Sequence, residues 1–598
     1  MFVENGRKYT GDFLPFDPFP NILFMDGEET LKTQLLKEAE QILLAPVPEL
    51  TLSDYRQFTK SGNRTLFEKK YFDRRKKLGT LVLAEMIEKK DRFTDAILQY
   101  LYSICEETTW CLPAHNTYER DKIQHEYPDA SRPVLDLFAC ETGATVSTVL
   151  YLMGERFDER SENIRNTIMK NLDERIKVPY LTEHFWWMGK DGEPMNNWTI
   201  WCTQNILITF FLGDFSKEER ESAFSKALKS MDYFLGAYGE DGCCDEGAQY
   251  YRHAALCLYQ SMNLLNEVTG DHFKKLNGEN KIRNMASYIY KVHVDDAYYI
   301  NFSDCSPMAG RAGVREYLFA DACGLDALKA FASEDAKKES EDALSDSSAF
   351  YDRVQTYLRR PELLNYKETS SPSDDTFFPS VGLFIARSRS FVLAVKAGDN
   401  DDSHNHNDTG SITVYKHGKP LLIDVGVESY TKKTFSPRRY EIWTMQSGFH
   451  NIMTFNGCEQ KNGPEYRASK VSHGLEKTRS SISMELHEAY DEKADLQSYT
   501  RSAVLHKEPD ERIEILDEFK MSGINGDTYL SLMCSLPPVV TEHAVSIGDL
   551  GEILIEGDDR IEIDTIPIED ERLLLTWDSP IYRIRIYPQR DSLKLTLK

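Results

Sequence analysis

Disulfide-type cysteine spacing, a secretory leader and long apolar runs are all missing from this sequence. Its 11 cysteines form no Cys-x-x-Cys pair, which argues against a disulfide-stapled extracellular scaffold and favours a reducing compartment. The first eight residues contain no apolar segment of the kind that directs secretion. No run approaches the length of about 18 apolar residues that a membrane-spanning helix needs. We therefore expect a cytoplasmic protein without a membrane span, or a periplasmic or secreted one if a leader has been removed.

Basic residues are also scarce. The chain has 71 lysines and arginines against 97 aspartates and glutamates, a net charge of −26. Because phosphate contacts need a basic surface, nucleic acid is not an expected partner. An anionic substrate would need a local groove of cations or amides that works against the field of the whole protein.

Size and apolar content predict a large, well-packed globular enzyme. Hydrophobic residues make up 41% of the 598 residues, and aromatic residues make up 11%. A chain of this length exceeds one ordinary core, so two or three large domains are expected.

From about residue 30 to residue 360, apolar residues recur with the 3.6-residue period of helices. Three such sets are Phe224, Leu228, Met231 and Leu235; Ile97, Leu98, Leu101 and Ile104; and Leu258, Met262 and Leu265. Several hundred residues of helix hairpins favour a helical toroid or solenoid over a small bundle. We predict a helical domain over residues 1–370, ending in a polar linker.

After the linker the pattern changes to the alternation of strands. The alternating apolar residues are Phe391, Leu393 and Val395; Ile412 and Val414; Ile561 and Ile563; Ile584 and Ile586; and Leu593, Leu595 and Leu597. His417-Gly418 predicts a hairpin turn. Many strands without intervening helices predict an antiparallel sheet domain over residues 375–598, so the predicted fold class is α+β with several domains.

One segment, 403–415, concentrates polar residues at a predicted loop-to-strand junction. His404 and His406 are two residues apart, so on a strand they would share a face. The return strand would bring Asp424 back near them. This pattern predicts a metal or catalytic constellation; the alternative is a solvated turn with incidental histidines.

Three further segments have chemical potential. Asn196 and Asn197 precede Trp198, a combination that could bind a sugar carboxylate and stack a ring; alternatively an asparagine caps a helix whose tryptophan lies in the core. After the turn at 241–247, a tyrosine near Arg252 or His253 could transfer protons; alternatively this is an ordinary helix start.

The third segment contains two adjacent arginines and another histidine. Arg438 and Arg439 offer bidentate contacts to a carboxylate or sulfate, unless they form an ordinary charged surface. His450 is a third candidate metal ligand, unless it serves only packing.

In order and spacing, these segments resemble the heparinase II/III-like polysaccharide lyase superfamily. The resemblance spans roughly residues 110–470. The segments that carry it are 110–116, 136–142, 196–198, 241–250, 404–411, 423–426, 439–440 and 450–451. It implies an incomplete α/α toroid followed by a layered antiparallel β-sandwich, and β-elimination at a uronic acid.

The resemblance also implies roles for individual residues. Asn197 would neutralise the uronate carboxylate, and Tyr250 would donate a proton to the leaving O4 and, in syn elimination, also take the C5 proton. His404 would assist as base or as carboxylate partner. Tyr251 stays an alternative to Tyr250. The implied substrate-binding residues are His115, Asn196, Trp198, Glu246, Arg438 and Arg439.

A zinc ion is the implied cofactor. His406, Asp424 and His450 match the ligand set of relatives that hold zinc, and two imidazoles with a carboxylate suit this metal. We expect the zinc to support the loop that carries His404 rather than to take part in the chemistry.

The predicted substrate is an acidic polysaccharide or oligosaccharide, heparan sulfate-like, another glycosaminoglycan or alginate-like. The missing leader favours imported oligosaccharides and therefore exo-action. One alternative is a glycoside hydrolase, which would need two carboxylates about 5–10 Å apart; Asp241, Asp245 and Glu246 are its candidates. The other is a non-catalytic protein that binds acidic glycans.

Overall fold

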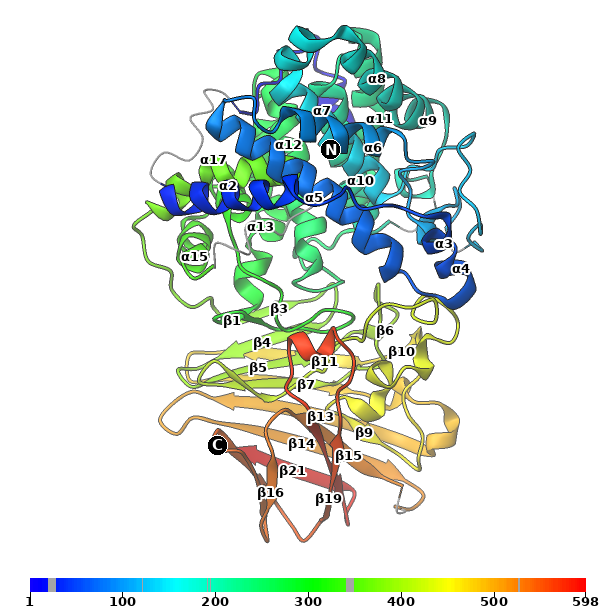
Figure 1. Cartoon of the computed structure of the whole chain (residues 1–598). Helices are drawn as coiled ribbons and strands as arrows, with labels where there is room; N and C mark the ends of the chain where they lie inside the picture. Colours follow the sequence, from blue (N-terminus) through cyan, green and yellow to red (C-terminus); the bar gives the residue numbers. More distant parts are fainter. Residues whose placement is uncertain (20–27, 121, 191, 194, 340–348, 525–526) are drawn as a thin grey trace. The chain divides into compact units, whose positions relative to one another are not determined.

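The computed structural model describes residues 1–19, 28–120, 122–190, 192–193, 195–339, 349–524 and 527–598. These residues form two compact units (Figure 1). The helical unit consists of Met1–Tyr238, Arg252–Ala286 and Arg311–Ser370. The β unit consists of Gly239–Tyr251, Ser287–Gly310 and Ser371–Lys598.

The helical unit is built from helix hairpins. Its longer helices are α2 (Glu29–Leu43), α5 (Thr65–Glu88), α6 (Thr94–Cys105), α7 (Leu137–Arg160), α8 (Glu162–Leu172), α10 (Asn197–Leu212), α11 (Lys217–Ala237), α12 (Ala255–Thr269), α14 (Val314–Cys323), α15 (Asp326–Ala336) and α17 (Phe350–Leu364). Shorter helices are α1 (Phe2–Gly6), α3 (Leu52–Tyr55), α4 (Gln57–Ser61) and α9 (Val178–Thr182). Helix α13 (Asn280–Val292) crosses the boundary between the units at Ala286.

Helix α10 is the central helix of this unit. It packs against α7, α11 and α12, and all of its residues are buried except Trp198 and Trp201. A helix that is apolar all round belongs in the core. The two tryptophans are therefore the places where α10 faces open space.

The predicted helical periods are confirmed in α6, α11 and α12, whose buried faces carry the expected residues except Leu98, which is half-buried. Helix α11 begins with a capping box in which Ser216 and Glu219 bond each other's backbone amides. Helix α7 is long and apolar enough to cross a membrane, but 83% of its apolar 18-residue stretch is buried within the structure. Such burial is what a core helix shows.

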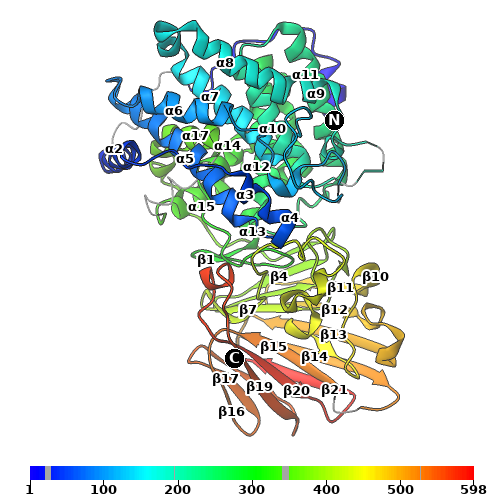
Figure 2. The same cartoon turned by 45° about the vertical axis from the view of Figure 1, so that its right-hand side comes forward.

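The β unit contains three main antiparallel sheets, drawn from green to red in Figures 1 and 2. The five-stranded sheet has the order β3 (Thr376–Phe378), β4 (Leu383–Arg387), β5 (Phe391–Lys396), β7 (Ile412–Lys416) and β8 (Lys419–Leu422). The four-stranded sheet has the order β19 (Arg560–Ile566), β20 (Ile581–Tyr587), β15 (Tyr529–Cys534) and β9 (Met453–Thr454).

The largest sheet has eight strands. Their order is β11 (Ser469–Leu475), β12 (Arg479–Glu485), β13 (Leu496–His506), β14 (Arg512–Met521), β21 (Ser592–Leu597), β18 (Gly551–Ile555), β17 (Ala544–Ile547) and β16 (Pro538–Val540). Two short pairs join β10 (Gly463–Arg467) to β6 (Asp399–Asn400), and β1 (His293–Asp295) to β2 (Tyr298–Tyr299). One apolar cluster draws side chains from all three main sheets, so the core lies between stacked layers.

The alternating residues predicted for strands lie in β5, β7, β19, β20 and β21. The predicted hairpin turn joins β7 to β8, with Lys416 paired to Lys419. His417 and Gly418 both have positive φ, 50° and 76°. Two residues of this kind are what a type I′ hairpin turn requires.

Two segments of the predicted helical domain belong to the β unit instead. The helical unit ends at Ser370, and Gly239–Tyr251 and Ser287–Gly310 are grouped with the strands. Their hydrogen bonds explain why. In the first segment, Asp241 accepts hydrogen bonds from the backbone N–H and the hydroxyl of Ser380. In the second segment, the carbonyls of Lys291 and His293 accept hydrogen bonds from Arg387.

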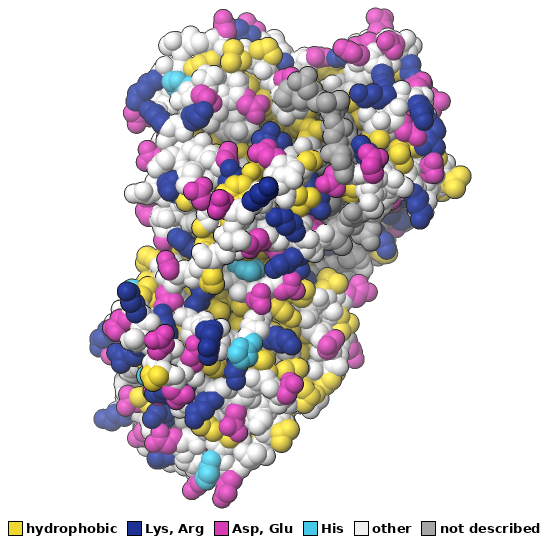
Figure 3. Space-filling view, turned by 90° about the vertical axis from the view of Figure 1, so that its left-hand side faces the viewer, with side chains coloured by type: hydrophobic (Ala, Val, Ile, Leu, Met, Phe, Trp, Pro, Cys, Tyr) yellow, Lys and Arg dark blue, Asp and Glu magenta, His cyan; other side chains and the backbone are white. Residues whose placement is uncertain are grey.

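Charge on the surface is mixed. On the face shown in Figure 3, acidic and basic side chains of the described residues are interspersed rather than gathered into a basic stripe. This distribution agrees with the net charge of −26.

Candidate active site

The loop between β6 and β7 carries His404 and His406. Residues 401–411 are not in a strand, so the strand alternation used to group the two histidines does not apply. They converge in another way, because both bond to the carboxylate of Asp304. His404 has a φ of 57°, a left-handed conformation that costs free energy in a non-glycine residue and that concentrates at functional sites.

Asp304 is the centre of this network and is completely buried. Its Oδ2 lies 2.8 Å from His404 Nδ1 and accepts a bond from the Tyr430 hydroxyl at 3.1 Å. Its Oδ1 lies 3.0 Å from His406 Nε2 and 2.6 Å from a guanidinium nitrogen of Arg439. Burial opposes ionisation, but these donors hold the pKa of Asp304 well below its usual range. Asp304 is therefore a fixed anion.

The two predicted arginines differ in their surroundings. Arg439 is half-buried and also donates to the backbone oxygens of His404 and Asn405, so it fixes the histidine loop. Arg438 is exposed and pairs with Glu441 at 2.7 Å. A solvent-exposed pair of this kind contributes little to stability.

Tyr250 lies within the β unit, beside this network. Its hydroxyl is hydrogen-bonded to that of Tyr430. The turn before it depends on Gly247, which has a φ of 88° and whose Cβ, if present, would lie 2.6 Å from the Cβ of Cys305. Tyr251 is completely buried and packs against Tyr288. Of the two adjacent tyrosines, Tyr250 is the one whose hydroxyl bonds Tyr430 and so joins the histidine network.

The cation beside Tyr250 is Arg572, which the sequence analysis did not identify. Its guanidinium lies over the Tyr430 ring at 4.6 Å and donates to the Asp304 carbonyl at 3.0 Å. Burial raises the pKa of Tyr250 well above its ordinary value, and Tyr430 and Asp304 raise it further, whereas Arg572 opposes them. The pKa of Tyr250 is thus raised overall, and the cation that counteracts the rise is Arg572 rather than Arg252 or His253.

His404 is placed between two carboxylates. Its Nε2 lies 3.2 Å from Glu246 Oε2, while its Nδ1 faces Asp304. Burial disfavours the charged imidazole, but Glu246 and Asp304 together raise the pKa of His404 above its ordinary value. The predicted residues Tyr250, His404 and Glu246 thus come together in the β unit.

His406, Asp424 and His450 form a second, adjoining cluster. One ligand atom from each lies within 4.8 Å of the others, and all three side chains are buried. His450 Nδ1 is 3.0 Å from Asp424 Oδ2. Nδ1 of His406 and Nε2 of His450 are buried without a hydrogen-bond partner among the described residues. Unpaired buried nitrogens beside a carboxylate are the donor set that a zinc ion needs.

The cluster is anchored from the large sheet. Arg501 is completely buried, bonds Asp517 with both ends of its guanidinium fork, and donates to the carbonyls of Gly410 and Asn451. These carbonyls follow the histidine loop and His450. One buried arginine therefore ties both ligand-bearing segments to β13 and β14.

The remaining predicted residues lie in the helical unit. Asn196 is the N-cap of α10, where its side chain accepts from the Trp198 backbone N–H at 3.0 Å, so the capping alternative holds for Asn196. Asn197 is the first residue of α10 and is buried. Trp198 packs against His115, at 4.7 Å between ring centroids, and His115 Nδ1 lies 2.9 Å from Asp136. Asn197, Trp198 and His115 thus lie around the start of α10.

Sequence reasoning missed Asp304, Tyr430 and Arg572. Asp304 had a weak signal, because it follows Asn301 and Ser303 in a short polar segment inside a helical region. Tyr430 and Arg572 had none, since each is an ordinary residue of a loop. Only the packing of distant segments brings them to Tyr250.

Comparisons with known proteins agree with this architecture. Residues 370–542 match the family described as heparinase II/III-like, C-terminal. None of the curated proteins compared with the sequence matches it. A solved structure of heparinase III is similar over 100% of this chain and 88% of that chain, with a TM-score of 0.64 and 12% identity.

Two further solved structures are similar to the chain. One is a heparan sulfate lyase mutant from Pedobacter heparinus (TM-score 0.56, 13% identity, 100% of this chain and 86% of that chain). The other is a chondroitin AC lyase from Streptomyces coelicolor in complex with chondroitin sulphate (0.55, 10%, 100% and 82%). At these identities the likeness shows the fold, an α/α toroid followed by an antiparallel β-sandwich, and the predicted fold class is confirmed.

Proposed function

We propose that this chain, whose residues 370–542 match the heparinase II/III-like C-terminal family, is a polysaccharide lyase. It cleaves acidic, uronic-acid-containing glycans by β-elimination. The observation that carries the proposal is the network in which Tyr250 meets Tyr430, and Tyr430 meets Asp304 and His404. A tyrosine hydroxyl connected to a buried carboxylate and an imidazole is suited to moving a proton.

In the proposed reaction the C5 proton of the uronate leaves, a C4=C5 double bond forms, and the C4–O4 bond breaks. The O4 of the leaving sugar takes a proton from the Tyr250 hydroxyl. In a syn elimination the same oxygen, as phenolate, first takes the C5 proton and then passes it to O4. In that course the tyrosine ends each cycle in the state in which it began. If the Tyr250 hydroxyl instead protonates O4 directly, His404 is the proposed acceptor of the C5 proton, and a proton returns to Tyr250 through Tyr430, whose hydroxyl is hydrogen-bonded to both.

The developing negative charge on the uronate carboxylate needs a partner. Asn197 is the proposed partner, because its amide stands at the start of α10, where backbone N–H groups also favour an anion. His404 is proposed to assist from the β unit. Loss of one such donor costs on the order of 10²–10³ in rate.

We propose a glycosaminoglycan of the heparan sulfate type as the first substrate to test. Similarity to heparan sulfate and chondroitin lyases supports this class. Action at chain ends, on short oligosaccharides, is proposed with it.

Zinc is the proposed cofactor, held by His406, Asp424 and His450. The unpaired buried nitrogens of the two histidines fit the ion. When bound, zinc would join the histidine loop to the segments of Asp424 and His450. His406 would then keep its Nε2 on Asp304, which fixes the same carboxylate that holds His404.

The test is ultraviolet absorbance of the unsaturated uronate, measured with purified protein and a panel of acidic glycans. The panel contains heparan sulfate, heparin, chondroitin sulfates, hyaluronan and alginate, as polymers and as short oligosaccharides. Tyr250→Phe should abolish the signal, and the matched variant Tyr251→Phe should keep it. Release of reducing ends without absorbance would instead show a hydrolase, and silence in both assays, with retained binding, a glycan-binding protein.

A further inference from the structure

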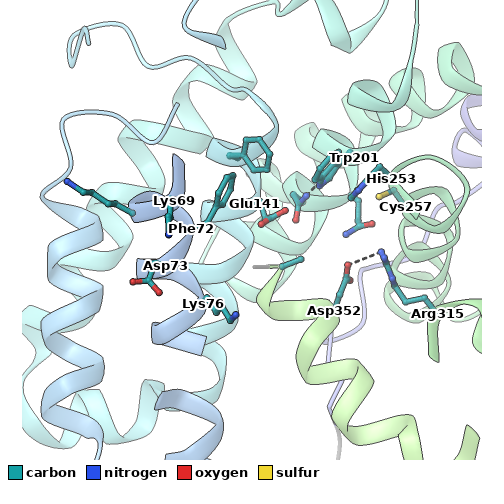
Figure 4. A pocket seen from close by; sticks show the side chains of 15 residues that line it. Lys69, Phe72, Asp73, Lys76, Glu141, Trp201, His253, Cys257, Arg315 and Asp352 are labelled. Carbon is teal, nitrogen blue, oxygen red and sulfur yellow. Dashed lines mark hydrogen bonds and ion pairs between the residues drawn. The ribbon is translucent and has the colours of Figure 1, made fainter. Parts of the chain in front are cut away.

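The interior of the helical unit contains a cavity of about 900 Å³ that the proposed chemistry does not use. Its wall is formed by one face each of several helices (Figure 4). Lys69, Phe72 and Lys76 come from α5, spaced three and four residues apart. Trp201 and Gln204 come from α10. Residues at these spacings lie on one side of a helix, so the helix faces point into the cavity together.

Aromatic rings line one side of the cavity. The Phe72 and Phe138 ring centroids are 4.8 Å apart, and those of Phe138 and Trp201 are 5.7 Å apart. The Trp201 indole is stacked on the His253 imidazole at 3.9 Å, with an interplanar angle of 15°. Burial, with Arg315 and Arg252, lowers the pKa of His253 to about 3, so this platform is neutral near pH 7. A flat neutral platform of this kind suits the apolar face of a sugar ring.

Two hydrogen-bond acceptors in the wall are unused. Gln204 is 3% exposed and Asp352 is 9% exposed, and both line the cavity. Gln204 Oε1 and Asp352 Oδ1 are buried without a hydrogen-bond partner among the described residues. Asp352 uses its other oxygen to pair with Arg315 at 2.9 Å (Figure 4). Buried acceptors that lack partners cost free energy, which a ligand with hydroxyl donors would recover.

The charge in the cavity differs from that of the whole chain. Four cationic side chains line it, Lys69, Lys70, Lys76 and Arg315, against three acidic ones, Asp73, Glu141 and Asp352. The chain as a whole has a charge of −26. On the α5 side three lysines line the cavity with Asp73, and Lys70 is paired with Asp54 at 2.8 Å. Lys69 and Lys76 are the cations that would favour an anionic substituent on a sugar.

The cavity is also connected to the start of α10. Asn197 and Trp201 are four residues apart on this helix and lie on the same side. His115 bridges the two places, because it packs on Trp198 at 4.7 Å and stacks over Phe138 at 6.1 Å. A continuous series of rings therefore leads from Trp198, the residue after Asn197, into the cavity.

We propose that this cavity is a saccharide-binding subsite, which holds a sugar unit bearing a sulfate or carboxylate group, next to the uronate at Asn197. The sugar ring packs on Trp201 and His253, its hydroxyls donate to Gln204 and Asp352, and its anionic group faces Lys76. This inference rests on the proposed function, since the ligand is part of the glycan to be cleaved.

The experiment is calorimetric binding of a sulfated glucuronate–glucosamine tetrasaccharide to the full chain carrying Tyr250→Phe, which prevents turnover. A desulfated tetrasaccharide of the same sequence is the second probe. Adding Trp201→Ala should weaken both at least tenfold, and Trp201→Phe less than that. Adding Lys76→Ala should weaken the sulfated probe by about fivefold and the desulfated probe little.

Lys77→Ala is the matched control, because Lys77 is the next residue of α5, pairs with Asp73 at 2.7 Å, and does not line the cavity. It should bind both probes as the parent does. Circular dichroism of each variant establishes that it is folded. If Trp201→Ala does not fold, the affinities of Trp201→Phe and Lys76→Ala still show whether the cavity binds the saccharide.

The inference is overturned if the parent binds neither probe, or if Trp201→Phe and Lys76→Ala bind as tightly as the parent. Those outcomes leave the lyase proposal standing if native protein still makes unsaturated product. Conversely, the cavity variants could lose binding while native protein makes no unsaturated product from any glycan. That outcome supports the subsite and rules out the proposed lyase activity.

Discussion

His404 Nδ1 and Asp304 Oδ2 lie 2.8 Å apart, although one hundred residues separate them in the sequence. Asp304 belongs to a segment between helices α13 and α14 that packs with the strands of the β unit. The same carboxylate holds His406, Arg439 and Tyr430. The arrangement of the candidate site therefore depends on one buried acid that lies outside the histidine motif.

Replacing that acid tests this dependence. Asp304→Asn keeps the shape but removes the charge, which leaves Arg439 and two histidines without their anion. We expect a loss of about 3 kcal/mol in the free energy of unfolding of the β unit and a fall in lyase rate on the order of 10²-fold. Denaturant unfolding and initial rates measure both. Asp401→Asn, at an exposed position of the same loop, should change neither; an Asp304→Asn protein with native stability and rate would contradict the assignment.

Arg572→Gln tests whether this cation lowers the pKa of Tyr250. Since the guanidinium favours the phenolate, its loss should raise the pKa of Tyr250 further, and the limb of the pH–rate profile that reports Tyr250 should move to higher pH. The rate at neutral pH should fall about tenfold or more, and Arg572→Lys should recover part of it.

The control for Arg572 is Arg560→Gln. Arg560 also lies over a tyrosine, Tyr587, at 3.7 Å, but its side chain is exposed. It should shift nothing. A uniform loss of rate by Arg572→Gln, with an unmoved pH profile, would show a role in folding alone.

Zinc loading is checked by elemental analysis and by unfolding. We expect one zinc ion per chain, and a lower unfolding midpoint after chelation. At a free zinc concentration about 100 times the Kd, binding stabilises by about 2.7 kcal/mol. His450→Ala should remove the metal and the chelator effect together, whereas His473→Ala, at an exposed position, should keep both. Zinc retained by His450→Ala would argue against this ligand set.

Asp402 predicts a pH dependence of stability. Asp402 and Asp408 share the buried ammonium of Lys396, at 2.7 Å and 3.3 Å. Burial raises the pKa of Asp402 from its ordinary value of 3.8 to about 6, although Lys396 opposes the shift. The folded chain therefore binds more protons than the unfolded chain between about pH 4 and 6. The protonated carboxyl of Asp402 thus stabilises the folded chain. This contribution to the free energy of unfolding is fully present below the window and is lost as the pH rises through 6.

The predicted size of that effect is on the order of 3 kcal/mol. Asp402→Asn should flatten the dependence of unfolding free energy on pH in this window, while Asp408 still neutralises Lys396. Asp549→Asn, at an exposed turn, should keep the slope of the parent. Equal slopes in all three proteins would remove Asp402 as the cause.

The sequence by itself determined the secondary structure and the fold class. The buried faces of α6, α11 and α12, and the strands β5, β7, β19, β20 and β21, follow from apolar periods because burial of one face acts over a few residues. The hairpin at His417-Gly418 was equally predictable, since a turn of two residues depends on their own φ angles. The cluster of His406, Asp424 and His450 was implied by the family resemblance, whereas the strand alternation that paired His404 with His406 does not apply in the loop that carries them.

Tertiary structure decided which polar residues meet. Asn196 and Asn197 are alike in sequence, and only the start of α10 shows that Asn196 is the cap. Asp304 and Arg572 come to Tyr250 from segments far away in the chain, through hydrogen bonds that no local pattern encodes. The cavity at Trp201 exists only because several helices turn one face each toward the same space. Contacts of this range depend on packing, and periodicity does not report them.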